Sequence, residues 1–191
     1  PRFCRYLDMP FQHISDPVLK KMNRKITRKE IEATMSRVRS QLPDVAWRTT
    51  FIVGFPTETD QDFEELVDFV SECHFQHLGI FLYSDEDNIR SSKFGDPIPL
   101  SLKEERKNRL MEIQQKISRE HHQKMVGSLQ QVLVGGFSSE TDLLLEGRNQ
   151  YQGPEVDGVV YINEGNATSA GFHQVEITEA HEYDLVGKIL N

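Results

Sequence analysis

The chain has 191 residues, of which 37% are hydrophobic, and a formal net charge of −8; this length is enough for one large or two small folded domains. No apolar run approaches the roughly 20 residues that a membrane span needs, and the first residues lack the pattern of a signal peptide, so we expect a cytoplasmic protein. Cys4 and Cys73 are the only cysteines and stand at no metal-ligand spacing, so the sequence supports neither a disulfide framework nor a metal site.

In the first two thirds of the chain, predicted strands alternate with predicted helices, a pattern typical of parallel βα units. Three helices begin at capping signals, namely Ser15, Thr27 with Glu30, and Thr59. β-Branched and aromatic residues predict strands at Trp47–Val53 and Leu78–Tyr83, and Tyr6–Pro10 resembles the end of another strand. Because the sequence begins inside this element and without Met, we expect it to be a fragment of a longer protein.

The polar residues 84–100, which include Asp85-Glu86-Asp87 and two prolines, predict an exposed loop rather than a cation site. A charged amphipathic helix, with Ser101 and Glu104 as its capping box, follows from Ser101 to about Met125, and His121 and His122 on it are expected to face solvent. After Gly127 the pattern changes to short alternating strands, which favours a small closed barrel of the OB type. The predicted strands are Leu129–Val134, Leu143–Glu146, Val159–Ile162, Gln174–Thr178 and Leu185–Ile189.

This change of pattern divides the chain into a predicted α/β domain, residues 1–125, and a predicted all-β domain, residues 126–191. The first holds 20 lysines and arginines and 20 acidic residues, whereas the second holds Arg148, Lys188 and ten acidic residues. All of the net negative charge therefore lies in the second domain. Such a surface repels nucleic acid, because phosphate binding depends on Lys and Arg, and it favours a basic protein as partner.

Ligands of parallel βα folds bind at the C-terminal ends of the strands, and three such ends are distinctive in this sequence. They are Met9–His13, Arg48–Glu58 and Phe81–Ser84. The second contains Gly54-Phe55-Pro56, a break that leaves main-chain amides and carbonyls free beside an aromatic ring and would suit a nucleoside. The same three residues are also compatible with an ordinary tight turn, and Phe55 and Tyr83 with packing in the core.

Four segments, DMPFQHISDPVLKKMNRK, RTTFIVGFPTETDQDFEELVDFV, HLGIFLYSDED and GPEVDGVVYINEG, resemble the methylthiotransferase branch of the radical-SAM superfamily, and specifically its RimO type. The resemblance runs along essentially the whole chain. It implies a partial, TIM-like radical-SAM barrel of six βα units and a C-terminal TRAM domain with an OB-like barrel. This chain would supply the C-terminal half of the radical-SAM barrel with its connecting helix, residues 1–125, and the whole TRAM domain, residues 126–191.

In that family S-adenosylmethionine lies across the mouth of the barrel, and the resemblance implies which residues would contact it. Gln12, Arg48 and Thr50 would contact its amino-acid and ribose portions, Val53, Gly54 and Phe55 would border adenine, and Tyr83 would close the pocket. The superfamily pattern Gly-x-Ile-x-Gly-x-x-Glu is imperfect here, because Thr50 replaces its first glycine and Glu58 lies one residue late.

The family also uses 4Fe-4S clusters to cleave this cofactor and to insert sulfur and a methyl group at an unactivated C–H bond. The cysteine spacing Cys-x3-Cys-x2-Cys is absent here, so the resemblance implies cluster ligands in a missing N-terminal half and a fragment that is inactive alone. The implied reaction is methylthiolation of an aspartate of a basic small-subunit ribosomal protein, the twelfth. Two alternatives remain open: methylthiolation of a transfer-RNA adenosine, as in the MiaB type, and a non-catalytic acidic module that binds proteins.

Overall fold

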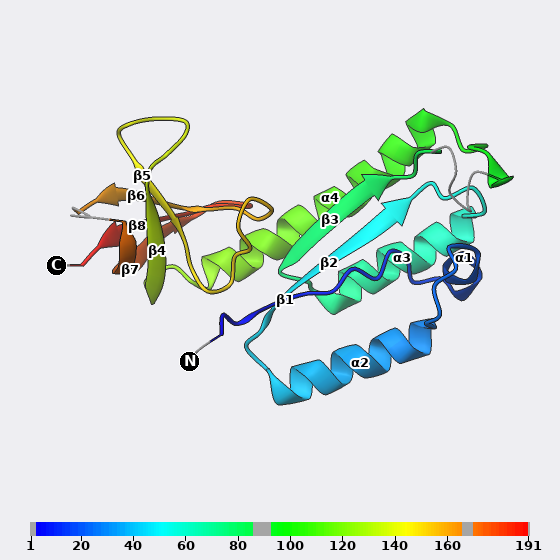
Figure 1. Ribbon diagram of the computed structural model, residues 1–191, viewed down its shortest axis with the longest axis horizontal. Coiled ribbons are helices and arrows are strands. Elements are labelled where there is room, and N and C mark those ends of the chain that lie inside the picture. Colours follow the sequence, from blue (N-terminus) through cyan, green and yellow to red (C-terminus); the bar gives the residue numbers. More distant parts are fainter. Residues whose placement is uncertain (1–2, 86–92, 166–169, 191) are drawn as a thin grey trace. The chain divides into compact units, whose positions relative to one another are not determined.

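The computed structural model describes residues 3–85, 93–165 and 170–190, and it divides into two compact units (Figure 1). The α/β unit comprises Leu7–Gln114, and the barrel unit comprises Gln115–Asn191 together with Pro1–Tyr6. The division falls inside the long helix α4, Leu100–Gln123, and so comes before the predicted boundary at residue 125. Among the described residues, every helix is too short or too polar to traverse a lipid bilayer.

The α/β unit contains a three-stranded sheet in the order β1-β2-β3. Its strands are β1 (Tyr6–Asp8), β2 (Ala46–Val53) and β3 (His77–Leu82), and its helices are α1 (Asp16–Lys21), α2 (Arg28–Gln41), α3 (Asp60–Cys73) and the first part of α4. β2 and β3 are parallel, with Arg48 opposite His77 and Val53 opposite Leu82. The predicted alternation of parallel strands and helices is therefore confirmed. Of the predicted loop at 84–100, residues 86–92 lie outside the described residues.

Two of the four predicted helix starts are confirmed as capping boxes, whereas the predicted box of Ser101 and Glu104 is wrong, because α4 already begins at Leu100. Thr27 accepts a hydrogen bond from the Glu30 main-chain N–H, and Thr59 accepts one from that of Asp62, while each acidic side chain accepts from the N–H of the cap residue. Ser15 stands at the N-cap of α1, but its side chain makes no capping bond. Its hydroxyl instead donates to the Asp62 carboxylate on α3, so this serine joins two helices.

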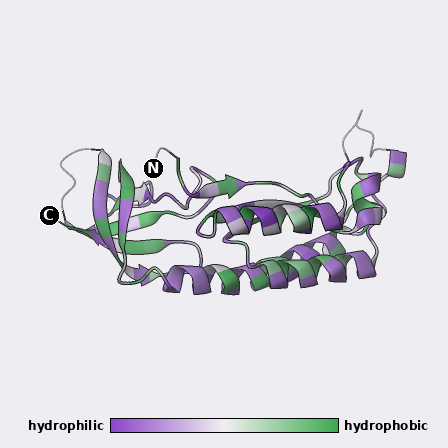
Figure 2. Ribbon diagram, turned by 90° about the horizontal axis from the view of Figure 1, so that it is seen from below, coloured by the Kyte–Doolittle hydropathy of each residue, from purple (hydrophilic) through white to green (hydrophobic). Residues whose placement is uncertain are grey.

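Residues of β2 alternate between the two faces of the sheet, as a strand requires. Trp47, Phe51 and Val53 are buried in one core with apolar side chains of all three long helices, namely Ile31, Met35, Phe63, Leu66 and Leu110. Arg48, Thr50 and Ile52 between them are only half-buried. Hydrophobic and hydrophilic residues alternate along the helices as well (Figure 2), which is typical of amphipathic helices that cover one face of a sheet.

The barrel unit is a closed five-stranded barrel, as predicted, with the strand order β4-β5-β6-β8-β7. Neighbouring strands are antiparallel except for β6 and β8, which are parallel. Alternate valine, isoleucine and leucine side chains fill its interior, among them Val132, Ile162, Val175 and Leu185. The strands are β4 (Leu129–Phe137), β5 (Leu145–Arg148), β6 (Val160–Glu164), β7 (Gly171–Ala180) and β8 (Leu185–Ile189).

The two adjacent histidines near the end of α4 are less exposed than the sequence predicts. His122 is only 5% exposed, and its Nδ1 lies 3.0 Å from the carbonyl oxygen of His181, so its predicted exposure to solvent is wrong. Burial lowers the pKa of His122, because it disfavours the charged imidazolium, although the His181 carbonyl and Asp184 act in the opposite direction. His122 is therefore part of the packing of the barrel unit.

The buried imidazole should make the barrel unit sensitive to acid. The pKa of His122 is lowered in the folded state. When the pH falls below the ordinary pKa of histidine, the unfolded chain therefore binds more protons than the folded chain, and the free energy of unfolding should decrease. Urea unfolding followed by circular dichroism at about pH 7.5 and about pH 5.5 measures this loss. The neutral variant His122→Gln should lose less stability over the same interval. An equal loss in both proteins would show that His122 contributes nothing to the acid sensitivity.

Candidate functional site

The half-buried face of the sheet brings two of the predicted site residues together. Arg48 and Thr50 stand two residues apart on β2, beside Gly79 of β3. A methyl group added to Gly79 would lie 3.2 Å from Arg48 Nη2 and 3.3 Å from Thr50 Oγ1, so the glycine leaves room for both side chains. Arg48 Nε also lies 3.5 Å from the Asp8 carboxylate. The face thus offers a guanidinium and a hydroxyl, which suit the carboxylate and hydroxyl groups of a ligand.

Gln12 joins this face from the segment that follows β1. Its main-chain N–H donates to the Thr50 carbonyl and its carbonyl accepts from the Ile52 N–H, each at 2.9 Å. The residue has a φ of 73°, in the left-handed region that side chains other than glycine seldom adopt. Its side chain is half-buried. Two main-chain hydrogen bonds therefore hold Gln12 next to Thr50.

A second group of predicted residues lies where β2 and β3 end. Gly54 has a φ of 76°, and its main-chain N–H donates to Glu58 Oε2 at 2.9 Å. The rings of Phe55 and Tyr83 pack edge to face with their centroids 5.2 Å apart. The Tyr83 hydroxyl is buried and has no hydrogen-bond partner among the described residues. A ligand that reached this hydroxyl would satisfy a polar atom that is otherwise unpaired.

Val53 lies apart from the other predicted site residues. Its side chain is fully buried in the helix-covered core, on the face of β2 opposite to Arg48 and Thr50. Its carbonyl oxygen already accepts a hydrogen bond from the Tyr83 N–H at 2.9 Å. We call the ends of β2 and β3, with Gly54, Phe55 and Tyr83, the rim of the sheet. Val53 contributes its main chain to this rim, while its side chain belongs to the core.

Several charged side chains, whose burial was not predicted, lie beneath this rim. Glu58 Oε1 accepts from Arg106 Nη1 at 2.7 Å, and the two side chains are 0% and 4% exposed. His13 Nε2 lies 3.6 Å from Glu58 Oε2, and His13 Nδ1 accepts from the Ser15 N–H at 3.0 Å. Lys103, one turn before Arg106 on α4, is also buried. The spacing of Lys103, Arg106 and Leu110 on one helix face is the signal that could have revealed them.

The two implied cofactors differ in how well these residues fit them. The guanidinium of Arg48, the unpaired Tyr83 hydroxyl and the Gly54 turn are compatible with S-adenosylmethionine, which carries a carboxylate, a ribose and an adenine. By contrast, the chain has only two cysteines, and among the described residues no three His, Cys, Asp or Glu side chains could share a metal ion. Burial raises the pKa of Cys73 to about 11, which disfavours the thiolate that an iron ion needs. The described residues therefore do not fit an iron–sulfur cluster.

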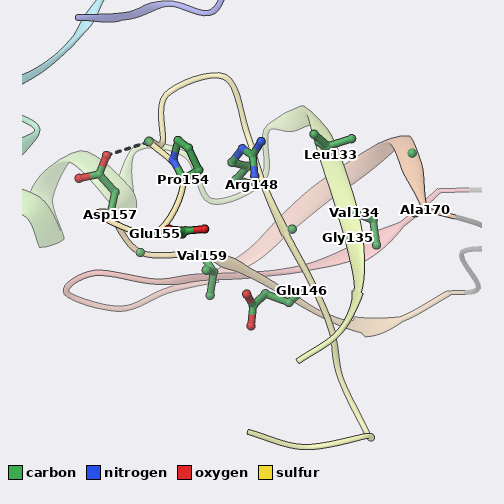
Figure 3. A pocket seen from close by; sticks show the side chains of 14 residues that line it. Leu133, Val134, Gly135, Glu146, Arg148, Pro154, Glu155, Asp157, Val159 and Ala170 are labelled. Atoms are coloured by element: carbon green, nitrogen blue, oxygen red, sulfur yellow. Dashed lines mark hydrogen bonds between the residues drawn. The ribbon is translucent and has the colours of Figure 1, made fainter. Parts of the chain in front are cut away.

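The barrel unit carries a groove of about 570 Å³ next to strands β4 and β5 (Figure 3). Arg148 and Glu146 of β5 line it together with Glu155. Its wall includes residues of the segment from Gly153 to Val159, in which the Gly153 N–H donates to the Asp157 carboxylate at 2.8 Å. Glycines form a large part of the lining, so main-chain groups are accessible there. This groove is a second place at which a ligand or a partner segment could bind.

The Glu58–Arg106 pair provides a test of how the rim is held. Glu58→Gln keeps the shape of the side chain but replaces one acceptor oxygen with an NH2 group, which must then face either Arg106 or the Gly54 N–H. Breaking a buried charge pair of this kind should lower the free energy of unfolding by about 3 kcal/mol. Urea unfolding followed by the fluorescence of Trp47, which is buried in the hydrophobic core of the α/β unit, measures the change.

Asp60→Asn is the matched control, because Asp60 binds the same arginine at 2.6 Å but its side chain is 93% exposed. This variant should be nearly as stable as the unaltered chain. Equal stability of the Glu58 and Asp60 variants would contradict a structural role for the buried carboxylate.

Two family models match the chain. The radical SAM superfamily matches residues 2–70, and the TRAM domain matches residues 126–190. Among solved structures, the coproporphyrinogen III oxidase HemN of Escherichia coli, described as a radical SAM enzyme, aligns with a TM-score of 0.48 and 17% identity over 76% of this chain and 41% of its own. At this level of similarity, that alignment carries no inference about the chain.

Curated relatives match the chain along its whole length. The ribosomal protein uS12 methylthiotransferase RimO of Geobacter sulfurreducens is 44% identical over 191 residues, which are 100% of this chain and 43% of the relative. The protein of the same name from Bdellovibrio bacteriovorus is 50% identical over 189 residues, which are 99% of this chain and 41% of the relative. The chain thus spans about two fifths of the length of these relatives. Over its whole length the chain is thus similar to a part of the radical-SAM methylthiotransferases of the RimO type, and it contains one segment that matches the radical SAM superfamily and one that matches the TRAM domain.

Proposed function

We propose that this chain is part of an enzyme that methylthiolates an aspartate of ribosomal protein uS12. The observation that carries the proposal is sequence identity of 44% and 50% to two RimO proteins that extends over both units, the α/β sheet and the barrel. Identity at this level over two differently folded units favours the same function, as well as the same architecture, as in these relatives. Modification of a ribosomal protein would place the enzyme in the cytoplasm.

S-Adenosylmethionine would bind at the C-terminal ends of β1, β2 and β3. Gln12, Arg48 and Thr50 would hold its amino-acid and ribose portions on the half-buried face of the sheet. Adenine would lie at the Gly54 turn, beside Phe55 and Tyr83 and along the main chain of Val53. Bound there, S-adenosylmethionine would supply the radical and methyl chemistry together with 4Fe-4S clusters held by parts of the enzyme that this chain does not contain.

The charge of the barrel supports a basic protein as substrate. Residues 126–191 carry ten acidic side chains and two basic ones, Arg148 and Lys188. Lys188 is paired with Glu176 at 3.3 Å, so its charge is partly neutralised. A field of this sign attracts cationic segments and repels phosphate. Both the charge and the names of the relatives therefore favour a ribosomal protein over transfer RNA, which is the substrate in the MiaB alternative. The names of the relatives also favour an enzyme over a non-catalytic binding module.

The full-length enzyme that contains this chain, reconstituted with iron and sulfide, tests the proposal directly. Incubated with S-adenosylmethionine, a reductant and uS12, it should increase the mass of one aspartate-containing peptide by one methylthio group. Unmodified transfer RNA, offered in a parallel reaction, should remain unchanged. Modification of transfer RNA with no change in uS12 would overturn the proposed substrate, and failure to cleave S-adenosylmethionine would overturn the proposed chemistry.

The groove of the barrel allows the contribution of charge to be measured. Exchanging Glu146 and Glu155 for lysine in the full-length enzyme should weaken binding of uS12 about tenfold at low salt. Two carboxylates that attract the basic uS12 would be replaced by two ammonium groups that repel it. The difference should shrink as the ionic strength rises. Glu112→Lys on the exposed side of α4 makes the same kind of charge change outside the barrel unit and serves as control. Calorimetric titration that gave equal losses for both proteins would rule out the groove as a specific contact surface.

A further inference from the structure

Lys103 of α4 is a buried lysine placed between the ends of two strands. Its side chain is 3% exposed. Its Nζ donates to the Tyr83 carbonyl at 2.8 Å and to Asp96 Oδ2 at 2.6 Å, and it lies 5.4 Å from the centroid of the Tyr83 ring. Burial of an ammonium group is unfavourable unless it is paired and hydrogen-bonded, and both conditions are met here.

The methylene stem of Lys103 also packs directly against Gly54. A methyl group added to this glycine would lie 2.3 Å from Lys103 Cγ and 2.7 Å from Cδ, so no other residue fits at position 54 while the lysine stays in place. The same side chain thus touches the turn after β2 with its stem and the end of β3 with its ammonium group. It therefore packs against both strand ends, which are also joined by the hydrogen bond from the Tyr83 N–H to the Val53 carbonyl.

Arg106, one helical turn further along α4, holds the same turn from another side. It binds Glu58, and Glu58 accepts the Gly54 N–H. The two cations contact the turn differently, because Arg106 binds the carboxylate that accepts its main-chain amide, whereas Lys103 packs against Gly54 itself and donates to the Tyr83 carbonyl. Of these two cations, it is Lys103 whose side chain contacts both Gly54 and Tyr83.

We propose that Lys103 is a positioning residue for the adenosine half of S-adenosylmethionine. The inference rests on the proposed function, in which Gly54 and Phe55 border adenine and Tyr83 closes the pocket. Lys103 is buried beneath the Gly54 turn and acts through it and through Tyr83. Without it, the Gly54 turn would lose the side chain that packs against it, and the Tyr83 carbonyl and ring would lose the ammonium group beside them. The unpaired Tyr83 hydroxyl would then lose its defined position as well.

This role has a distinct kinetic consequence. The adenine ring is separated by the ribose from the carbon–sulfur bond that is cleaved, so contacts that position the ring stabilise the bound cofactor and the transition state about equally. Loss of such contacts raises KM and leaves kcat nearly unchanged. A purely structural role would instead lower the amount of folded enzyme without changing the affinity of the folded fraction.

The test uses the full-length enzyme that contains this chain, with Lys103→Met, Lys103→Arg and the control Lys107→Met on the same helix. S-Adenosylhomocysteine is the probe for calorimetric binding, and KM and kcat are measured with S-adenosylmethionine. Lys103→Met should raise Kd and KM about tenfold, while kcat stays within about twofold. The arginine variant keeps the charge that faces Tyr83 and Asp96, so its Kd should stay within about threefold of the unaltered value. Lys107→Met should bind normally.

An unchanged Kd in folded Lys103→Met would overturn the positioning role and leave the proposed function intact. Weakened binding in an enzyme that does not modify uS12 would support the positioning role and overturn the proposed substrate. Absence of binding by the unaltered enzyme would overturn both. If Lys103→Met does not fold, Asp96→Asn replaces it, because Asp96 is a partner of Nζ and its side chain is 35% exposed. A Kd of this variant within about twofold of the unaltered value would likewise overturn the role.

Discussion

The rim of the α/β unit depends on a single buried carboxylate. Glu58 uses both of its oxygens, one for the Gly54 N–H and the other for Arg106. A buried main-chain amide needs an acceptor, and a buried carboxylate needs a cation, so each group satisfies the requirement of the next. The result is a connection from the end of β2 to α4 across 48 residues of sequence. The conformation of the Gly54 turn is a property of this connection and not of the turn alone.

The alternation of side chains along β2 separates the stability of the fold from its proposed function. Trp47, Phe51 and Val53 pack against the helices in the hydrophobic core, while Arg48 and Thr50 lie on the other face. The two sets can therefore change with little mutual interference. Substitutions on the core face should act on folding, and those on the opposite face should act on the ligand.

Elements that are determined by neighbouring residues were predicted from the sequence, whereas side chains whose environment depends on distant residues were missed. The helix starts at Thr27 and Thr59 and the five barrel strands follow from spacings of a few residues, and these are present. The partners of Lys103, Arg106 and His122 could not be predicted in this way, because each partner lies elsewhere in the fold. Charged side chains on an amphipathic helix normally face solvent. Similarly, the alternation in β2 predicts that Val53 faces the core, but the resemblance alone placed it at the cofactor.

Gln12 illustrates what the backbone contributes to recognition. A glycine would adopt its left-handed conformation at lower free-energy cost, so the glutamine makes the folded state less stable than it could be. The hydrogen bonds to Thr50 and Ile52 hold that conformation and thereby fix the direction of the Cα–Cβ bond. Much of the conformational entropy of this residue is therefore lost when the chain folds and not when a ligand arrives. Preorganisation of this kind trades thermodynamic stability of the free protein for affinity.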